Sequence, residues 1–359
     1  MGNLPNITSL RFFLAILVVI SHIPEFSANR GFPYYNSMPL FHKGIEAVYM
    51  FFSLSGFLII RNLYLEKFKT GTISLKDFYR RRILRIFPLY YSVLIFGLIY
   101  YNFLLPELGF AVEQRQYSLL QGAILGGTFF SNVLANYRPG GILEILWSIG
   151  IEEQFYLFVA PLFLLIPSKR IVYFLLFFTV CYFIIYNIED IDFFRKYKLL
   201  FYYFSMSGII AVLSIKFPDF KVKSAVKGLI FFLFILYFVT DIFAAGTSEL
   251  TYQLISMILF SVLIFCIVQT PYRLLENSRL KYLGKISYGI YMLHAIVMHF
   301  VGLIFMNLHS EILDHHPAIF ILIFNLLTLT LTIFVSHFSY RYFESFFLKL
   351  KTAKTYTQP

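Results

Sequence analysis

Ten runs of apolar residues, each close to the length that crosses a lipid bilayer, constrain the fold of this chain more than any other feature. The hydrocarbon core of a bilayer is about 30 Å thick, and a helix of about 20 apolar residues crosses it. Because backbone polar groups in lipid must be satisfied within the spanning segment, we predict an all-α polytopic integral membrane protein with about ten transmembrane helices. The runs lie near residues 10–25, 45–62, 86–105, 145–166, 171–188, 199–215, 228–245, 252–269, 286–307 and 317–338.

The composition agrees with this prediction, because 59% of the 359 residues are hydrophobic and only 14% are charged. No polar stretch reaches about 50 residues, the lower limit for an independent domain, so function is expected to reside in the helices and short loops. Both cysteines, Cys181 and Cys266, fall within predicted spans and give no disulfide framework. The first run is expected to be a retained span, since residues 1–10 contain no Lys or Arg and no small-residue cleavage site follows.

An additional run at 117–133, which contains Gln121 and three glycines, could be an eleventh span or a helix that lies against the membrane. If it does not cross, 22 of the 30 Lys and Arg residues fall in loops on one side and seven on the other. The positive-inside rule then predicts that both termini are cytoplasmic and that 117–133 is a membrane-associated helix. The net charge of +11 is explained by loops that face anionic lipid headgroups, so we predict membrane lipids and no nucleic acid as partners. The predicted location is the plasma (inner) membrane, in multi-pass form.

The first apolar run carries two polar residues, Arg11 and His22, which are costly in hydrocarbon unless they have partners or a function. Eleven residues make three helical turns plus about 20°, so both lie on one helix face about 16 Å apart. This spacing predicts a face that lines a cavity. The alternative is a helix end, marked by Ser21, His22 and Pro24, whose imidazole packs or reaches to the membrane surface.

Four arginines lie directly before the third run, in the segment 78–88. Arg82 and Arg85 are spaced i, i+3, which makes them neighbours on one helix face. Guanidinium groups at that spacing can grip phosphates bidentately, so this pair is predicted to bind an anionic ligand. Arg80 and Arg81 are interpreted as an orientation signal beside a membrane helix, which is also the alternative for the pair.

Six segments, in register along nearly the whole chain, resemble the membrane-bound acyltransferase-3 family. Any one of them is weakly specific, whereas six in order are strongly specific. They are Leu10-Arg11 with His22, the segment 51–59 around Ser55-Gly56, Arg82 to Pro88 with Arg85, Trp147 to Tyr156 with Glu152, Ser287 to His294 with Tyr288 and Tyr291, and Tyr340 to Glu344.

The resemblance implies an enzyme that moves acyl groups, commonly acetyl from acetyl-CoA, onto sugars and lipids at the cell envelope, with no bound cofactor. Two departures are visible. Glu344 precedes Ser345 and Phe346 where the family often has a basic residue and a proline, and the chain ends fifteen residues past Glu344 where many relatives continue into a soluble hydrolase-like domain. We expect an acyltransferase-3-like transmembrane domain over 1–345 and a short cytoplasmic tail over 346–359. Such a chain would act alone or pass its acyl group to a partner protein.

His22 is the predicted general base, because imidazole titrates near neutrality. The resemblance supports this role and leaves open whether His22 activates the acceptor or carries the acyl group covalently. Arg11 is predicted to hold a CoA phosphate or to stabilise charge on the thioester oxygen, with a buried acid pair as the alternative. Glu152 begins the fourth run at a depth similar to that of His22, and we expect it to orient His22 rather than to lie as an interfacial carboxylate in water, which is expected for Glu153.

Other polar residues of the segments are assigned to packing or to the acceptor. Ser55-Gly56 is interpreted as a small pair that lets backbones approach closely, and Ser55 is not predicted to be a nucleophile. Tyr288, Tyr291 and His294 form a polar stripe along the ninth run that could bind the acceptor or hydrogen-bond between helices. With Trp147 they are the predicted substrate-binding residues.

No metal site is predicted, because the candidate ligands cluster in one short loop without a second ligand pair at zinc spacing. These are His309, Asp314, His315 and His316.

The favoured interpretation is therefore a membrane O-acyltransferase that moves an acyl group from cytoplasmic acyl-CoA to a hydroxyl of an envelope polysaccharide or related glycan. A glycan or lipid-linked sugar is the expected acceptor, while the sequence leaves its identity, the size of the acyl group and the oligomeric state open. The alternative is a transporter of a lipid-linked or acylated glycan, since ten helices with buried polar groups also describe carriers.

Overall fold

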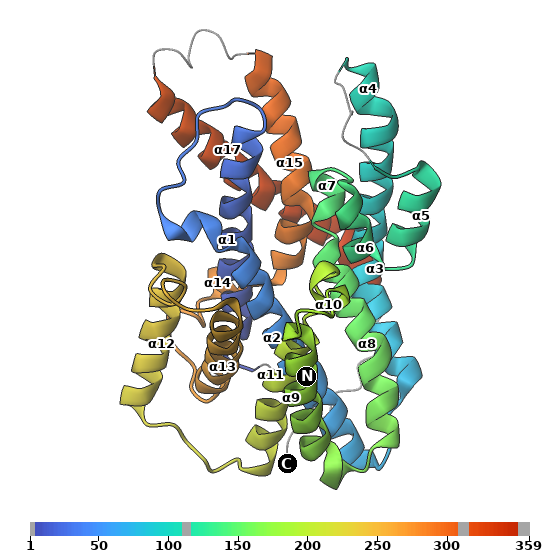
Figure 1. Cartoon of the computed structure of the whole chain (residues 1–359), viewed down its shortest axis with the longest axis vertical. Helices are drawn as coiled ribbons and strands as arrows, with labels where there is room; N and C mark the ends of the chain where they lie inside the picture. Colours follow the sequence, from blue (N-terminus) through green and yellow to red (C-terminus); the bar gives the residue numbers. More distant parts are fainter. Residues whose placement is uncertain (1–3, 110–115, 308–315, 351–359) are drawn as a thin grey trace. The chain divides into compact units, whose positions relative to one another are not determined.

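The computed structural model describes residues 4–109, 116–307 and 316–350, and within these ranges every regular element is a helix (Figure 1). Eight helices are long and apolar enough to cross a membrane. Two shorter apolar helices, α11 (Phe201–Lys216) and α12 (Ser224–Val239), lie at the two remaining predicted runs. The predicted all-α polytopic fold class is therefore confirmed. The eight segments are Ile7–Ala28, Gly44–Thr70, Leu75–Glu107, Gly141–Leu165, Ser168–Asn187, Glu249–Val268, Ser287–Met306 and Pro317–Lys349.

The ambiguous run at 117–133 contains α5 (Leu119–Gly127), which has nine residues and begins with a capping box formed by Ser118 and Gln121. Nine residues rise about 14 Å, less than half the thickness of the hydrocarbon core. The very short α6 (Ser131–Leu134) follows. This run is thus helical, as predicted, but no helix in it is long enough to cross the membrane.

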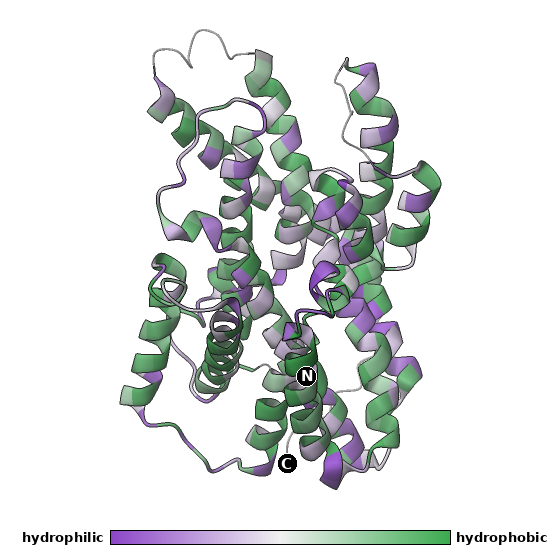
Figure 2. Ribbon diagram, in the orientation of Figure 1, coloured by the Kyte–Doolittle hydropathy of each residue, from purple (hydrophilic) through white to green (hydrophobic). Residues whose placement is uncertain are grey.

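The described residues form two compact units: 55–213 with 342–350, called here the first unit, and 4–54 with 214–341, called the second unit. Helix α2 (Gly44–Thr70) contributes to both. Hydrophobic residues cover most of α12 and α13, whereas hydrophilic residues gather near helix ends and loops (Figure 2). This distribution is that of helices surrounded by lipid.

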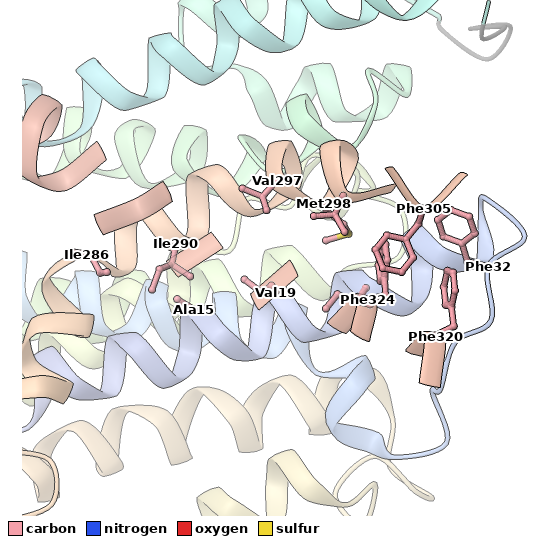
Figure 3. Packing of buried hydrophobic residues seen from close by; sticks show 12 residues of the cluster. Ala15, Val19, Phe32, Ile286, Ile290, Val297, Met298, Phe305, Phe320 and Phe324 are labelled. Atoms are coloured by element: carbon pink, nitrogen blue, oxygen red, sulfur yellow. The ribbon is translucent and has the colours of Figure 1, made fainter. Parts of the chain in front are cut away.

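The second unit is built around α1 (Ile7–Ala28), which packs against α13, α14, α15, α17 and the short helix η1. Its core joins small and branched residues of α1 to α15, and continues into a cluster of phenylalanine rings (Figure 3). Phe305 packs edge-on against both Phe320 and Phe324. Such contacts fix α15 against α17. The elements of this unit beyond α1, α2 and α12 are η1 (Pro39–His42), α13 (Glu249–Val268), α14 (Ser278–Lys285), α15 (Ser287–Asn307) and α17 (Pro317–Phe338), which runs into η5 (Ser339–Glu344).

The first unit is built around α3 (Leu75–Ile99), which packs against α5, α7, α8 and α18. Its start is capped by Ser74, whose side chain accepts the Asp77 N–H. Because α3 begins at Leu75, the arginine cluster lies on the helix itself and not on a preceding loop. The remaining elements are η2 (Tyr100–Leu104), α4 (Leu105–Glu107), η3 (Ala135–Tyr137), α7 (Gly141–Glu144), α8 (Trp147–Leu165), η4 (Ser168–Arg170), α9 (Ile171–Asn187), α10 (Phe193–Lys196) and α18 (Ser345–Lys349).

Two adjacent residues near the end of α2 tie the first unit together. The Lys67 ammonium donates to the Phe163 and Ile166 carbonyls, both at 2.6 Å, and to the Leu164 carbonyl at 2.9 Å. These are carbonyls that the last turn of α8 leaves without intrahelical donors, and a cation there also complements the helix dipole. Glu66 accepts the Ser74 N–H at 2.8 Å, which anchors the start of α3.

Gly56 confirms the predicted close approach of backbones. A Cβ atom at Gly56 would lie 2.3 Å from the Phe204 carbonyl oxygen and 2.4 Å from its Cα. Since real Cβ atoms do not approach so closely, only glycine permits this contact between α2 and α11. Because α2 approaches so closely at Gly56, the adjacent Ser55 lies within hydrogen-bonding distance of Glu152 on α8.

Candidate active site

Helix α1 carries Arg11 and His22 as one continuous element, as the sequence predicts. Arg11 is half-buried, and so is His22. Pro24, inside the helix, has no N–H to donate to the Ile20 carbonyl, so the backbone ladder is interrupted beside His22. His22 therefore lies on a continuous helix, next to a turn in which one backbone hydrogen bond is missing.

The His22 ring stacks on the ring of His294 from α15, with centroids 5.3 Å apart and an interplanar angle of 26°. On its edge, His22 Nδ1 lies 3.7 Å from Glu25 Oε2, one turn further along α1. The structure thus brings together two residues, His22 and His294, that the sequence had predicted separately. It adds a carboxylate that the sequence analysis did not consider.

His294 is fully buried, and its two ring nitrogens have different surroundings. Nδ1 lies 2.5 Å from the Tyr291 carbonyl oxygen. A carbonyl only accepts, so Nδ1 carries the proton and, in the neutral ring, Nε2 carries the lone pair. Among the described residues, no group hydrogen-bonds to the buried Nε2. A buried acceptor without a donor costs roughly 1–3 kcal/mol, which a hydroxyl group arriving from a ligand would recover.

Tyr291 and Tyr288 lie on α15 with His294, as predicted. The Tyr291 ring is buried and contacts the rings of His294, at 5.9 Å, and Phe51, at 6.4 Å. Tyr288 is half-buried. The predicted stripe therefore exists, and one of its members supplies the backbone carbonyl that fixes the tautomer of His294.

In the first unit, Glu152 is held by two hydroxyl groups. Ser55 Oγ donates to Oε1 at 2.8 Å and Tyr156 Oη donates to Oε2 at 3.0 Å. Hydrogen bonds to both oxygens favour the ionised carboxylate and fix its plane. The interpretation of Ser55 as a packing residue was wrong, because the serine is a hydrogen-bond donor to the predicted functional carboxylate, while its neighbour Gly56 provides the close packing.

Arg82 lies between two aromatic rings, with Cζ 5.7 Å from the centroid of Phe78 and 5.4 Å from that of Tyr156. Its Nε is buried and has no hydrogen-bond partner among the described residues. The rings fix the guanidinium by cation–π contact, and its remaining donors are not used up by a carboxylate.

The four arginines of α3 separate into two pairs. Arg80 donates to the Leu350 carbonyl at 2.9 Å, and Arg81 lies 3.8 Å from Glu66. Within the described part of the chain, neither Arg82 nor Arg85 forms an ion pair or a hydrogen bond. The pair that spacing selected for anion binding thus forms no hydrogen bond or ion pair within the described residues, although Arg82 is electrostatically coupled to Glu153.

Glu153 differs from its predicted state. The residue is half-buried, and its Oε1 is enclosed without a hydrogen-bond partner among the residues that the structure describes, so this oxygen is not in water. Glu153 lies on α8 next to Glu152 and is electrostatically coupled to Arg82.

The comparisons with known proteins decide the family. The sequence profile of the acyltransferase domain of the acyltransferase-3 family matches residues 4–337. This chain belongs to that family. The match covers every predicted site residue, in both units.

Relatives of this family member carry acetyltransferase names. The peptidoglycan O-acetyltransferase OatA of Listeria monocytogenes is 33% identical over 46% of this chain and 25% of its own length. A protein of Acidianus two-tailed virus with a provisional acetyltransferase name is 25% identical over 84% of this chain and 85% of its own. A protein of Staphylococcus aureus with a provisional O-acetyltransferase name is 24% identical over 97% of this chain and 58% of its own. No solved structure matches the chain.

Trp147 opens α8, and its ring faces the ammonium of Lys198 at 4.6 Å. A cation–π contact of this kind holds the indole in place. The structure thus gives Trp147 a definite orientation in the first unit.

Helical spacing could have revealed two residues that the sequence analysis missed. Tyr156 follows Glu152 by four positions and Glu25 follows His22 by three, which are neighbour spacings on a helix. Ser55 gives no such signal, since its contact with Glu152 spans 97 positions.

His22 belongs to the second unit and Glu152 to the first.

No group of three potential metal ligands occurs in residues 4–109, 116–307 and 316–350. Of the histidine-rich loop, His309, Asp314 and His315 lie outside the described residues.

Proposed function

We propose that this family member is a membrane-bound O-acyltransferase that moves an acyl group, acetyl foremost, from acyl-CoA to a hydroxyl of an envelope polysaccharide or related glycan. The observation that carries the proposal is the pair Arg82 and Arg85, whose guanidinium groups form no ion pair or hydrogen bond within the described chain, with Arg82 against the ring of Tyr156, which donates to the carboxylate of Glu152. The name of the Listeria relative, a peptidoglycan O-acetyltransferase, supports a cell-wall polymer as the class of acceptor.

Acyl-CoA is the proposed donor because it carries several phosphates and is held in the cytoplasm. Arg82 and Arg85, neighbours on α3, would bind those phosphates, and the ring of Tyr156 would keep Arg82 in register with Glu152. The distribution of basic residues supports a cytoplasmic location for this end of α3 and the plasma membrane as the site of action.

His22 is the proposed proton acceptor. In direct transfer, the acceptor oxygen attacks the thioester carbon, His22 takes the hydroxyl proton, and the C–S bond breaks to release CoA, whose sulfur recovers a proton. In the covalent route, His22 attacks the thioester carbon and the C–S bond breaks to release the CoA thiolate. The acceptor oxygen then attacks the acyl carbon and the C–N bond to the imidazole breaks, while the hydroxyl proton is given up and the thiolate takes one. Arg11, on the same helix, would stabilise the negative charge on the thioester oxygen or hold a CoA phosphate.

The acceptor would be bound by His294, Tyr288, Tyr291 and Trp147. His294 is the most specific of these, because its buried Nε2 lone pair requires a donor and a sugar hydroxyl is one. Glu152, held by two hydroxyls, supplies a fixed negative charge that would favour a protonated intermediate. A separate acyl-accepting protein remains a proposed partner.

The decisive experiment measures thioester cleavage by purified protein in nanodiscs with radiolabelled acetyl-CoA and a panel of glycan acceptors. Wild type is compared with His22→Ala, and monodisperse elution checks the fold. We expect transfer in the wild type and a loss of at least about 10²-fold in the variant. Equal turnover in both would contradict the role of His22. Movement of labelled glycan across vesicles without CoA release would establish a carrier instead.

A further inference from the structure

Glu25 is an acidic residue beside the proposed proton acceptor that no prediction or comparison assigns. It lies three residues after His22 on α1, and its Oε2 is 3.7 Å from His22 Nδ1. The recorded side-chain contacts of His22 are this one and the stack on His294. Its ring is thus bounded by an imidazole face on one side and a carboxylate at one edge.

We propose that Glu25 is the positioning residue of His22, and that its carboxylate, 3.7 Å from Nδ1, favours the ring with the proton on Nδ1, so that Nε2 accepts the proton of the acceptor hydroxyl. This inference rests on the proposed function. A neutral imidazole has one N–H and one lone pair. At 3.7 Å the contact is longer than a hydrogen bond, so the carboxylate acts through its negative charge and favours the N–H on the nitrogen nearer to it. The other nitrogen then carries the lone pair, as a base requires.

Glu25 also supplies the charge that the reaction needs. When His22 takes a proton, the imidazolium lies beside a carboxylate, which favours the charged ring. The stacked ring of His294 does not oppose this, because an N–H on its buried Nε2 would have no acceptor among the described residues. The pair therefore contains one ring that changes charge and one that stays neutral.

The titratable groups Lys43 and His299, which lie on elements packed near this part of α1, contact partners other than His22. Gly44, at the start of α2, packs against Ser21, and the adjacent Lys43 directs its ammonium to Tyr252 at 2.9 Å and Asp241 at 3.1 Å. On α15, the Nδ1 of His299 lies 2.8 Å from the Ala295 carbonyl. In the described parts of α13, α14 and α17, no titratable side chain has a recorded contact with His22.

Because Glu25 is largely exposed, its substitution is expected to leave the folding of the protein unchanged. The side chains of His22 and Glu25 are 41% and 69% exposed, and ion pairs at such exposure contribute little to folding. Glu25→Gln keeps the size of the residue and removes its charge. Asp219→Asn is the matched control, because Asp219 is an exposed carboxylate of the same unit with no recorded partner among the described residues.

The experiment measures two quantities on the full-length protein. The first is the pH dependence of His22 labelling by diethyl pyrocarbonate, followed by mass spectrometry, which reports the unprotonated ring without requiring turnover. The second is the rate of acyl transfer against pH. For Glu25→Gln we expect kcat to fall about tenfold with KM for acyl-CoA unchanged, and the labelling midpoint to move to lower pH, because the negative charge beside the ring is removed. Glu25→Asp should restore most of both, and Asp219→Asn should change neither.

Each other outcome overturns the assignment. A wild-type midpoint in Glu25→Gln means that the carboxylate does not act on His22, and a shifted midpoint with wild-type kcat means that its action is not used in transfer. Failure of the proposed function looks different, because His22→Ala would then turn over like the wild type. In that case the labelling midpoint alone still decides whether Glu25 holds the ring, and an unchanged midpoint rejects it.

Discussion

The two units satisfy their central polar groups in opposite ways. In the first unit, the Glu152 carboxylate receives a hydroxyl donor on each oxygen. In the second unit, His294 has a partner for Nδ1 only, and Nε2 is buried without one among the described residues. Groups that are fully hydrogen-bonded are held in place, whereas an unsatisfied lone pair is available for a ligand. The first unit thus holds a fixed carboxylate, and the second unit holds a buried lone pair that can accept a hydrogen bond.

The largest effect is expected from Glu152→Gln. The variant removes the fixed charge but leaves an amide that can still accept from Ser55 or Tyr156, so the fold should persist. We expect acyl transfer to fall by about 10²-fold. Turnover in nanodiscs, with elution as the control for folding, measures it. Wild-type rates would show that the first unit does not contribute charge to the reaction.

Arg85→Lys should raise KM for acyl-CoA by roughly tenfold, because a lysine cannot make the bidentate contact with phosphate. Arg81→Lys is the matched control, since Arg81 is already paired with Glu66 and should leave KM unchanged. A binding assay with acyl-CoA gives both values. Equal affinity of Arg85→Lys and wild type would remove the phosphate role from this residue.

His294→Phe keeps a ring against His22 and removes the Nε2 lone pair. If that lone pair binds the acceptor, kcat/KM for the acceptor should fall by about tenfold, equivalent to the loss of one hydrogen bond of roughly 1.4 kcal/mol. Hydrolysis of acyl-CoA without acceptor should change less. An unchanged kcat/KM would mean that His294 acts only in packing and that its Nε2 lone pair is not used to bind a ligand.

Ser55→Ala should lower turnover only by about threefold to tenfold, because Tyr156 still holds the other oxygen of Glu152. Ser53→Ala is its control on the same helix, since Ser53 donates to the Tyr49 carbonyl of its own helix and not to Glu152. The ratio of the two rates measures the contribution of the Ser55 bond. A ratio of one would mean that Tyr156 alone positions the carboxylate.

The smallest effect concerns stability in the second unit. The hydrogen bond from Lys281 holds the pKa of Glu276 below its ordinary value, and the Asn6 N–H adds to this at 2.6 Å. A carboxylate with a lowered pKa contributes stability above its unfolded pKa of about 4.3, and that contribution is lost as the pH falls through the folded value. Thermal midpoints of wild type and Glu276→Gln should therefore differ near pH 7, and the gap should narrow as the pH falls below the unfolded pKa of about 4.3. A gap that does not narrow on acidification would contradict this pairing.

Much of the fold could be predicted from the sequence, because in lipid the length and polarity of a segment decide whether it is a spanning helix. The positions of the ten apolar helices and the non-spanning α5 follow from that rule. The sequence also predicted that Arg82 and Arg85 are neighbours on one helix face, because residues spaced i, i+3 are neighbours on any α-helix. Ser55 was not, because its contact with Glu152 depends on how α2 packs against α8.

The sequence by itself determined the class of the protein, its family and the residues that carry polar groups into the apolar helices. Tertiary structure decided what those groups do to each other. It made Ser55 a hydrogen-bond donor and enclosed Oε1 of Glu153. It also gave Arg80 a carbonyl partner and Arg81 a carboxylate partner, placed Arg82 between two aromatic rings, and stacked His22 on His294. The physical reason is that helix formation depends on neighbours three and four residues apart, whereas hydrogen bonding and burial depend on side chains that only packing brings together.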